Sequence, residues 1–416
     1  MNWVLVVLLG LSVVGLYVYG SKLRRVQQEA PTLSPIDFPD YRSASSASIA
    51  VIIPAYNEAD NIADCVLAVL TGTTLAADRL SLWVVDDQST DRTWQILQDL
   101  QQQLQDSRLH LQPGLPRPEQ EVWVGKNWAC TQVAEQLDSD YLLFIDADVR
   151  LQPGAIELAL AAMDRDQIDL LSCGPAIVCG CLGEWLAQPL IISTILVGFS
   201  FTAVNDPNTD SAFAAGPFML FRRQAYQQIG GHRSVGDQVV EDVELARRVK
   251  FHGLKLFYIQ GINLAKVQMY RSWGTLWEGW TKNLYQGSQR NFKGMMFFIA
   301  VLLLICLVPW LGLGWGLGWG LVWGLGRGLG QSVSLSTLII FGLSVAGIIL
   351  QYDMRRVLSI VSGIAPRYWW LTGLGGLAVV GIAVGSIIKT ETGWGWTWRG
   401  RSLDSVRQLR IRNLQH

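Results

Sequence analysis

The chain has 416 residues, of which 50% are hydrophobic and 16% are charged, and its formal net charge is −1. This balance lacks the basic surplus that attracts nucleic acid, so nucleic acid is not an expected partner. Charges are absent from four long stretches, residues 2–21, 185–205, 295–326 and 328–352, and residues 357–388 carry only Arg367. Each stretch is long enough to span a bilayer core of about 30 Å, so the sequence predicts an integral membrane protein.

The first apolar stretch, residues 1–21, predicts a retained transmembrane anchor. No basic residue precedes it, whereas Lys22, Arg24 and Arg25 follow it, and a secretory signal shows the opposite order. By the positive-inside rule, the next domain then lies on the cytoplasmic side of a bacterial inner or plasma membrane. The six cysteines show no CxxC pair and fit that reducing compartment. Residues 22–47 predict a linker, which is rich in Ser and Pro in its second half.

Residues 48–293 predict one α/β domain. The expected elements, in chain order, are a strand over 48–54, a helix over 58–70, a strand over 80–87, a helix over 91–105, a strand over 108–112, a helix from about 126, and a strand over 141–145. Apolar strands that alternate with helices are typical of a parallel sheet covered on both faces. In such sheets, ligands bind beyond the carboxyl ends of the strands.

Polar and acidic residues stand at three of these strand ends, at residues 54–58, 86–91 and 146–148. Turn chemistry explains Asp at any one of them. Asp146 and Asp148, however, are like charges separated by one small residue, and they repel each other unless a cation lies between them. Because Mg²⁺ or Mn²⁺ binds one or two carboxylates together with substrate phosphates, the three ends together predict a divalent metal that holds a diphosphate.

Five motifs in register resemble those of family 2 glycosyltransferases over roughly residues 48–290. They are PAYNE at 54–58, VVDDQSTD at 84–91, GKNWA at 125–129, DAD at 146–148 and VED at 240–242. The resemblance implies a GT-A fold, which is Rossmann-like with a mostly parallel sheet. It also implies a UDP- or GDP-sugar donor, a divalent metal, and inversion at the anomeric carbon.

The same resemblance implies roles for individual residues. The nucleotide-sugar site would comprise Pro54, Ala55, Asn57, Glu58, Asp86, Asp87, Lys126 and Asp146. Asp148 would be the firmest metal ligand, with Asp146 beside it. Asp242 would be the catalytic base that takes the proton of the acceptor hydroxyl. From the residues alone, acids at the start of a helix over 240–253 also complement the helix dipole, and that explanation suffices for Glu244.

Contacts to the acceptor or the diphosphate are expected from Glu241, His232, Arg271, Trp273, Trp277, Trp280 and Lys282. Ordering of its loop is an alternative role for His232, which ranks below Asp242 as a general base. Many lipid-modifying members carry a QxxRW signature, and residues 268–283 take its place here. A Trp-rich helix in the lipid headgroup region would explain the same residues.

Residues 182–205 predict an interfacial segment rather than a crossing, because a single crossing would separate the DAD and VED motifs. Residues 294–390 form the expected carboxyl-terminal transmembrane region. In it, residues 295–311 enter the membrane, residues 333–350 return, and residues 357–388 form a re-entrant hairpin bent near Pro366. The Gly-rich stretch from residue 312 allows close helix packing, although low-complexity drift explains it as well. The basic tail, residues 391–416, contains Trp398–Arg401, which resembles a WxGR element of lipid glycosyltransferases.

The expected acceptor is an alcohol dissolved in the membrane. GGHRSV, VEDVELARRVK and MYRSW resemble the carotenoid 2′-O-glycosyltransferases, which implies a hydroxylated carotenoid. VNDP at 204–207 resembles the hopanoid-associated branch, so a hopanoid or another glycolipid alcohol is the alternative. A polysaccharide synthase would need more spans, and an inactive membrane scaffold would not be expected to keep all of its carboxylates.

Overall fold

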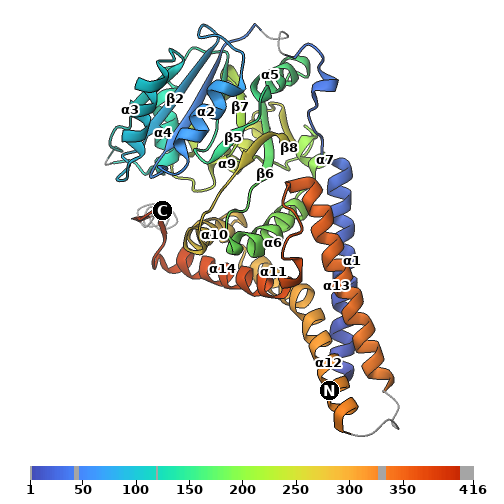
Figure 1. Cartoon of the computed structure of the whole chain (residues 1–416). Helices are drawn as coiled ribbons and strands as arrows, with labels where there is room; N and C mark the ends of the chain where they lie inside the picture. The colour runs from blue at the N-terminus through green and yellow to red at the C-terminus, as the bar shows by residue number, and fades with distance from the viewer. Residues whose placement is uncertain (1, 42–45, 119, 327–333, 403–416) are drawn as a thin grey trace. The chain divides into compact units, whose positions relative to one another are not determined.

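A computed structural model describes residues 2–41, 46–118, 120–326 and 334–402. The chain forms two compact units, each considered by itself below (Figure 1). The α/β unit comprises residues 29–178 and 199–269 and the residues from 395 onward, and the helical unit comprises residues 1–28, 179–198 and 270–394. Each unit is therefore assembled from segments that are far apart in the sequence.

The α/β unit contains an eight-stranded sheet of order β3-β2-β1-β4-β7-β6-β8-β5. The strands are β1 (Ile49–Ala55), β2 (Leu80–Asp86), β3 (Leu109–Pro113), β4 (Tyr141–Phe144), β5 (Val149–Leu151), β6 (Leu170–Ile177), β7 (Met219–Arg222) and β8 (Leu256–Val267). The pairs β1–β2, β1–β4, β2–β3 and β6–β8 are parallel. This arrangement confirms the predicted α/β fold with a mostly parallel sheet.

The mostly parallel sheet also contains antiparallel pairs. β7 is antiparallel to both of its neighbours, β4 and β6, and β5 is antiparallel to β8, so the sheet is mixed. Strand β1 is buried along nearly its whole length, which explains its unbroken apolar run. Because β1, β2 and β4 run in parallel, their carboxyl ends meet at one edge of the sheet.

Helices accompany the strands as the alternating pattern predicts (Figure 1). They are α2 (Ile62–Gly72), α3 (Thr93–Leu104), α4 (Gly125–Ala134), α5 (Ala155–Arg165), α7 (Phe201–Asn205), α8 (Arg223–Gln228) and α9 (Glu241–Phe251). α2 begins later than the predicted Glu58. The delay leaves residues 56–61 as a loop beyond β1, in which Asn57 adopts a left-handed backbone with φ of 54°.

The predicted linker is in part ordered against the α/β unit. The first helix, α1 (Asn2–Glu29), continues past residue 21. The Pro31 carbonyl then accepts a hydrogen bond of 2.8 Å from the amide of Gln260, a residue of β8. Farther on, the guanidinium of Arg165 lies 3.9 Å from the ring centre of Phe38. These contacts fix Pro31 to the sheet and Phe38 to α5.

Among its described residues, the helical unit contains four helices that are long and apolar enough to cross a membrane, within Trp3–Glu29, Phe292–Gly318, Leu335–Ser362 and Trp369–Thr392. Its helices after α1 are α6 (Leu182–Gly198), α10 (Trp273–Gly287), α11 (Phe292–Leu302), α12 (Val308–Gly326), α13 (Leu335–Ser362) and α14 (Thr372–Thr392). α6 is apolar but shorter than the four. The chain leaves α13 at Gly363 and enters α14 at Thr372, so Pro366 lies between two helices. The re-entrant hairpin over residues 357–388 stays a prediction.

Close helix packing in the helical unit depends on particular glycines. A Cβ on Gly375 of α14 would lie 2.6 Å from the Leu186 carbonyl oxygen of α6, and one on Gly312 of α12 would lie 2.9 Å from a Leu9 methyl group of α1. Gly314 and Gly318 face open space instead. Only some positions of the described Gly-rich stretch are therefore explained by packing.

Candidate functional site

The loops beyond β1 and β2 are tied together by side chains of the predicted nucleotide motifs. The Asn57 amide donates to the Ser89 hydroxyl at 2.9 Å, and the Asn57 side-chain oxygen accepts from the Thr90 amide at 2.8 Å. The Glu58 amide donates to the Thr93 hydroxyl at 2.8 Å. The structure thus brings the PAYNE and VVDDQSTD motifs into one site, with Pro54 and Ala55 at the end of β1 beneath them.

Asp86 and Asp87 are both buried at the end of β2 but differ in their partners. Asp86 accepts from the Ser89 amide at 3.1 Å, and its other carboxylate oxygen is buried without a partner. Burial raises the pKa of Asp86. The carboxylate of Asp87 pairs with Arg117 at 3.1 Å and with Arg401. The Asp87 carboxylate can lie this close to the main chain of α4 because residue 125 is a glycine. A Cβ on Gly125 would lie only 2.2 Å from that carboxylate.

Lys126, at the start of α4, joins two acidic motifs. Its ammonium nitrogen lies 2.6 Å from the Asp146 carboxylate and 2.7 Å from the Glu241 carboxylate. Burial by itself lowers the pKa of Lys126, but the two carboxylates outweigh it and raise the pKa well above its usual value. The side chain therefore remains a cation that holds the DAD and VED motifs together.

Asp242 follows Glu241 at the start of α9. Its carboxylate accepts from the amides of Gly216 and Val243, at 2.9 and 2.8 Å. Burial, with the neighbouring Glu241 carboxylate, raises the pKa of Asp242 to about 6. A carboxylate with this pKa is ionised at neutral pH and still a better proton acceptor than a free Asp.

Gly216, which the sequence analysis did not single out, lies among these groups. A Cβ there would be 2.9 Å from the Lys126 nitrogen, 3.4 Å from an Asp242 oxygen and 3.6 Å from an Asp146 oxygen. Its neighbourhood is therefore the place where the GKNWA, DAD and VED motifs meet. Only tertiary contacts reveal this role, because the sequence AAGPF carries no chemical signal of its own.

The residues present fit a divalent cation beside Asp148. One carboxylate oxygen of Asp148 is buried without a hydrogen-bond partner. Burial, together with the Asp146 and Glu58 carboxylates, raises the pKa of Asp148 well above its usual range. Within the described residues, no group of three or more His, Cys, Asp or Glu side chains is placed to hold a metal by itself. Asp146 and Asp148 supply two carboxylates, and one oxygen of Asp148 has no partner in the described structure. This set suits a metal whose remaining ligands come from a substrate diphosphate.

His232 lies in the interior, with its side chain 1% exposed. Its Nδ1 lies 2.9 Å from the Tyr226 hydroxyl, which in turn accepts from the His232 amide at 3.0 Å. The ring also contacts Phe144 of β4, at 4.5 Å between ring centres. Burial lowers the pKa of His232 to about 3, so the ring is neutral. These contacts favour the loop-ordering role over contact with an acceptor.

Asn127, next to Lys126, is a buried residue that the sequence analysis did not single out. Its side-chain amide donates to the carbonyls of Val235, Gly236 and Gln238, at 2.8, 3.2 and 2.9 Å. These carbonyls belong to the loop that leads into α9. α4 therefore fixes the position of Glu241 and Asp242 through Asn127. The signal was present in the GKNWA motif, where a polar residue follows the lysine at a buried helix start.

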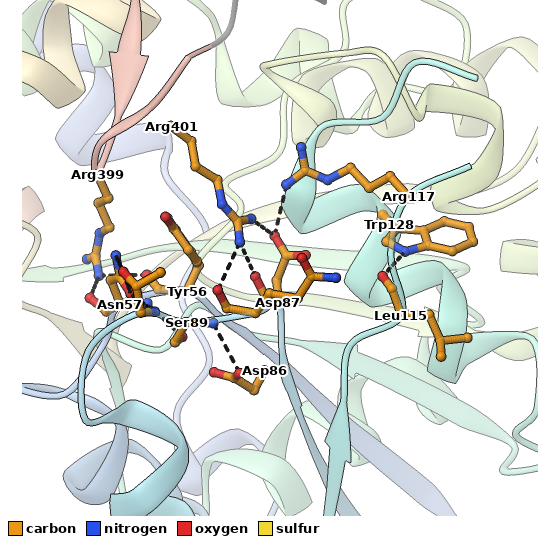
Figure 2. A network of polar contacts seen from close by, with 12 residues as sticks. Tyr56, Asn57, Asp86, Asp87, Ser89, Leu115, Arg117, Trp128, Arg399 and Arg401 are labelled. Atoms are coloured by element: carbon orange, nitrogen blue, oxygen red, sulfur yellow. Dashed lines mark hydrogen bonds and ion pairs between the residues drawn. The ribbon is translucent and has the colours of Figure 1, made fainter. Parts of the chain in front are cut away.

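The last described residues bring two arginines to the nucleotide motifs (Figure 2). Arg399 pairs with Glu58 at 2.8 Å, and Arg401 pairs with Asp87. The sequence analysis noted the Trp398–Arg401 element but gave it no role. The two arginines on either side of Gly400 could have indicated a site for acidic partners. The sequence did not show which residues they contact.

Two family profiles match the chain. Glycosyl transferase family 2 matches residues 50–230, and glycosyl transferase family group 2 matches residues 141–382, which is more than half of the chain. The chain belongs to glycosyltransferase family 2. The family resemblance seen in the five motifs is thereby confirmed.

The chain is similar to proteins named 4,4'-diaponeurosporenoate glycosyltransferase. The one from Staphylococcus haemolyticus is 27% identical over 272 residues, which cover 65% of this chain and 69% of that protein. The one from Staphylococcus aureus strain USA300 is 25% identical over 293 residues, which cover 70% and 72%.

Among solved structures, the mannosyltransferase PcManGT from Pyrobaculum calidifontis, in complex with GDP-Man and Mn²⁺, matches with a TM-score of 0.52 and 16% identity. The match covers 94% of this chain and 98% of that one. This likeness is one of fold, and it confirms the expected GT-A architecture of this family 2 member.

The expected acceptor or diphosphate contacts of residues 271–282 belong to the helical unit. Trp280 is buried there and donates to Gln188 of α6 at 3.1 Å, while Trp277 packs against Gly385 of α14. Trp273 is 44% exposed. Arg271 and Lys282 flank them in the sequence. Trp277 and Trp280 thus have packing roles within their own unit, and contact of this group with substrate stays a prediction.

Proposed function

We propose that this family 2 member transfers a sugar from a nucleoside-diphosphate sugar to a carotenoid held in the membrane, with inversion at the anomeric carbon. The observation that carries the proposal is the meeting of Lys126, Asp146 and Asp242 around Gly216. It supports a site in which a proton acceptor lies close to a cation and to the carboxylates suited to a metal and a diphosphate.

Asp242 is the proposed catalytic base. As the acceptor oxygen forms its bond to the anomeric carbon, the bond from that carbon to the diphosphate oxygen breaks and the nucleoside diphosphate leaves. The acceptor proton passes to the Asp242 carboxylate, whose pKa of about 6 suits that task. Attack from the face opposite the leaving group gives inversion. The amides of Gly216 and Val243 hold the carboxylate in place during the reaction.

The donor site is proposed to lie at the carboxyl ends of β1, β2 and β4. Pro54, Ala55, Asn57 and Glu58 line it from β1, and Asp86 and Asp87 from β2, with Lys126 close to the phosphates. The GDP-Man in PcManGT supports a nucleotide-sugar donor for this shared fold, and a UDP-sugar is the other candidate. Sugar selectivity depends on the shape of the pocket.

Asp148 and Asp146 are the proposed ligands of the divalent cation, Mg²⁺ or Mn²⁺. When bound, the cation acts as a Lewis acid that stabilises the charge of the leaving diphosphate. The Mn²⁺ in PcManGT and the partnerless oxygen of Asp148 support this assignment. Lys126 holds Asp146 at 2.6 Å and so fixes one of the two carboxylates.

A carotenoid acceptor is supported by the relatives, which are named for a carotenoid substrate. A hydroxylated carotenoid is the first choice, because a hydroxyl proton requires a base such as Asp242. The ending of "diaponeurosporenoate" denotes a carboxylate, so a carotenoid carboxylate is the second candidate. The four apolar helices support a membrane-embedded enzyme, for which we propose a cytoplasmic α/β unit.

A transfer assay tests the proposal. Full-length protein in detergent is incubated with radiolabelled UDP- or GDP-sugars, Mn²⁺ or Mg²⁺, and a lipid extract that contains carotenols, carotenoid carboxylates and hopanoids. We expect label in a pigmented lipid, loss of transfer with EDTA, and a fall of at least about 100-fold for Asp242→Asn.

The matched control is Glu244→Gln, which removes an acid from the same helical turn. Glu244 pairs with Arg247 at 3.1 Å and has no contact with the site residues in the described structure, so activity should be unchanged. Label in a colourless lipid would replace the carotenoid acceptor by a hopanoid or another glycolipid alcohol. Label in no lipid would contradict the proposed function.

A further inference from the structure

The carboxyl-terminal hairpin of the α/β unit is not used by the proposed reaction steps. Its strands β9 (Thr397–Trp398) and β10 (Arg401–Ser402) pair antiparallel, with Trp398 opposite Arg401. Arg399 and Gly400 form the turn, with φ of 48° and 82°. Two successive left-handed residues suit a tight two-residue hairpin, but this conformation is unfavourable for an arginine. Contacts of the arginine side chain must offset that cost.

Arg399 binds the loop beyond β1. Its guanidinium donates to the carbonyl of Tyr56 at 3.1 Å and to the carbonyl of Asn57, and it pairs with the Glu58 carboxylate at 2.8 Å. The side chains of Arg399 and Glu58 are only 19% and 13% exposed. One side chain therefore binds three consecutive residues of the PAYNE motif in a largely desolvated position.

Arg401 binds the loop beyond β2. Its guanidinium pairs with the Asp87 carboxylate and donates to the carbonyls of Asp87 and Gln88, the latter at 3.2 Å. It also stacks on the Tyr56 ring, 3.4 Å from the ring centre. The planar guanidinium thus uses its donors on one loop and its face on the other. A lysine could not make both kinds of contact.

These contacts differ from ordinary surface ion pairs. An exposed pair joins two flexible side chains and contributes little. Here both guanidiniums also bind main-chain carbonyls, and the acidic partners are residues that the family motifs place at the nucleotide (Figure 2). The hairpin therefore connects the two loops whose relative position shapes the donor pocket.

We propose that the hairpin Thr397–Ser402 is part of the donor site, in which Arg399 and Arg401 position the Tyr56–Glu58 and Asp87–Gln88 loops to bind the nucleoside diphosphate. The inference rests on the proposed function, since it assigns positioning residues to that donor site. It predicts that loss of either arginine weakens nucleotide binding, because the loops lose a shared tether, while chemistry at Asp242 continues once the donor is bound.

The test uses full-length protein in detergent with Mn²⁺. Binding of UDP and of GDP is measured by calorimetry, and the donor KM and kcat are measured with a carotenoid acceptor. We expect Arg401→Gln and Arg399→Gln each to weaken nucleotide binding and raise the donor KM by about tenfold or more. The kcat at saturating donor and the acceptor KM should change by less than about threefold, because the hairpin acts on the donor loops alone.

Arg165→Gln is the matched control. Arg165 stacks on Phe38 at 3.9 Å and pairs with Asp166 at 2.9 Å in an exposed position, so its loss removes a stacked and paired guanidinium without touching a nucleotide motif. It should leave nucleotide binding within about twofold of the wild type. If Arg401→Gln fails to fold, Arg401→Lys keeps the charge, removes the planar fork, and should also weaken binding.

The outcomes separate the two proposals. Wild-type protein that binds neither UDP nor GDP would contradict the proposed donor and hence the proposed function. Wild-type protein that binds nucleotide while both arginine variants bind equally well would contradict only the hairpin inference. Tighter binding by the variants would also overturn it, because the hairpin would then obstruct the pocket.

Discussion

Asp242 is the residue whose ionisation should control the reaction. With a pKa of about 6, its carboxylate is ionised at pH 7 and gains a proton as the pH falls through 6. A protonated carboxyl cannot accept the acceptor's proton, so kcat with a carotenol should fall by about tenfold per pH unit below pH 5. The measurement is a pH–rate profile at saturating donor and Mn²⁺.

A carotenoid carboxylate provides an internal comparison for that profile. It is already ionised and has no proton to lose, so its transfer should show no acid limb from Asp242 above its own titration. A flat profile for the carotenol between pH 5 and 7 would remove Asp242 from the role of base.

Gly216 should be sensitive to a single added methyl group. The Cβ of Gly216→Ala would lie 2.9 Å from the Lys126 nitrogen, so this flexible side chain must move. We expect a loss of kcat of at least about tenfold, because Lys126 also contacts Asp146 and Glu241. The free energy of unfolding should change by less than about 1 kcal/mol, since the clash is with the end of a side chain.

Gly72→Ala is the control for that substitution, because a Cβ on Gly72 would meet its nearest neighbour at 3.7 Å, an ordinary contact. Activity and thermal unfolding of both variants are measured side by side. Equal activity of Gly216→Ala and the wild type would show that the neighbourhood of Gly216 is not where the reacting groups meet.

At the scale of elements, α4 orders the start of α9. Asn127→Ala removes the donor of three hydrogen bonds, to the carbonyls of Val235, Gly236 and Gln238. The cost should be about 2–4 kcal/mol of unfolding free energy, since each unsatisfied buried group costs about 1–3 kcal/mol. Thermal unfolding should show a Tm lowered by roughly 5–10 °C.

Asn208→Ala is the matched control, because Asn208 is exposed and, within the described residues, its hydrogen bonds go to Asp206 beside it. It should leave both Tm and activity unchanged. Asn127→Ala should also lower kcat in protein that is still folded at the assay temperature, because Glu241 and Asp242 lose their support. A normal kcat in that variant would mean that α9 is positioned by other contacts.

The candidate site was predictable where its chemistry follows apolar strands. Asp86 and Asp146 come at or just after the ends of β2 and β4, and parallel strands bring such ends to one edge of the sheet. The antiparallel direction of β7 was not predictable, because a short apolar run has no signal for the direction in which it pairs. Gly216, which precedes β7 closely, was missed because its neighbours Lys126, Asp146 and Asp242 are brought to it only by the tertiary fold.

The carboxyl-terminal hairpin shows a second limit of sequence reasoning. β9 and β10 are two residues long, too short for any periodicity to indicate strands. Arg399 and Arg401 are far from Glu58 and Asp87 in the chain, and nothing local predicts which carboxylates they meet. The sequence could indicate a basic element around Gly400, and only the folded chain shows its partners.

At the scale of the whole molecule, an ion pair joins the two basic clusters of the helical unit. One cluster follows the first apolar stretch, and the other lies within α13. Arg24 of α1 pairs with Asp353 of α13, and Asp353 also pairs with Arg356 at 3.2 Å. By the positive-inside rule, we expect the two basic clusters to lie on the same side of the membrane, which is proposed to be the cytoplasmic side. The ion pair adds a structural reason to an expectation that rested on charge alone.

This orientation predicts the labelling of single cysteines in a chain whose native cysteines are replaced by Ser. Lys22→Cys and Arg356→Cys should react with a membrane-impermeant maleimide only after cells are opened, whereas Leu335→Cys should react in intact cells. Residues 335 and 356 lie on one helix and are about 32 Å apart at 1.5 Å per residue, which matches a bilayer core of about 30 Å. All three side chains are exposed in the helical unit, so a difference in labelling would report the membrane side. Labelling of Lys22→Cys and Arg356→Cys from opposite sides would contradict the placement of these two residues on the same side of the membrane. Labelling of both in intact cells would contradict the proposed cytoplasmic α/β unit.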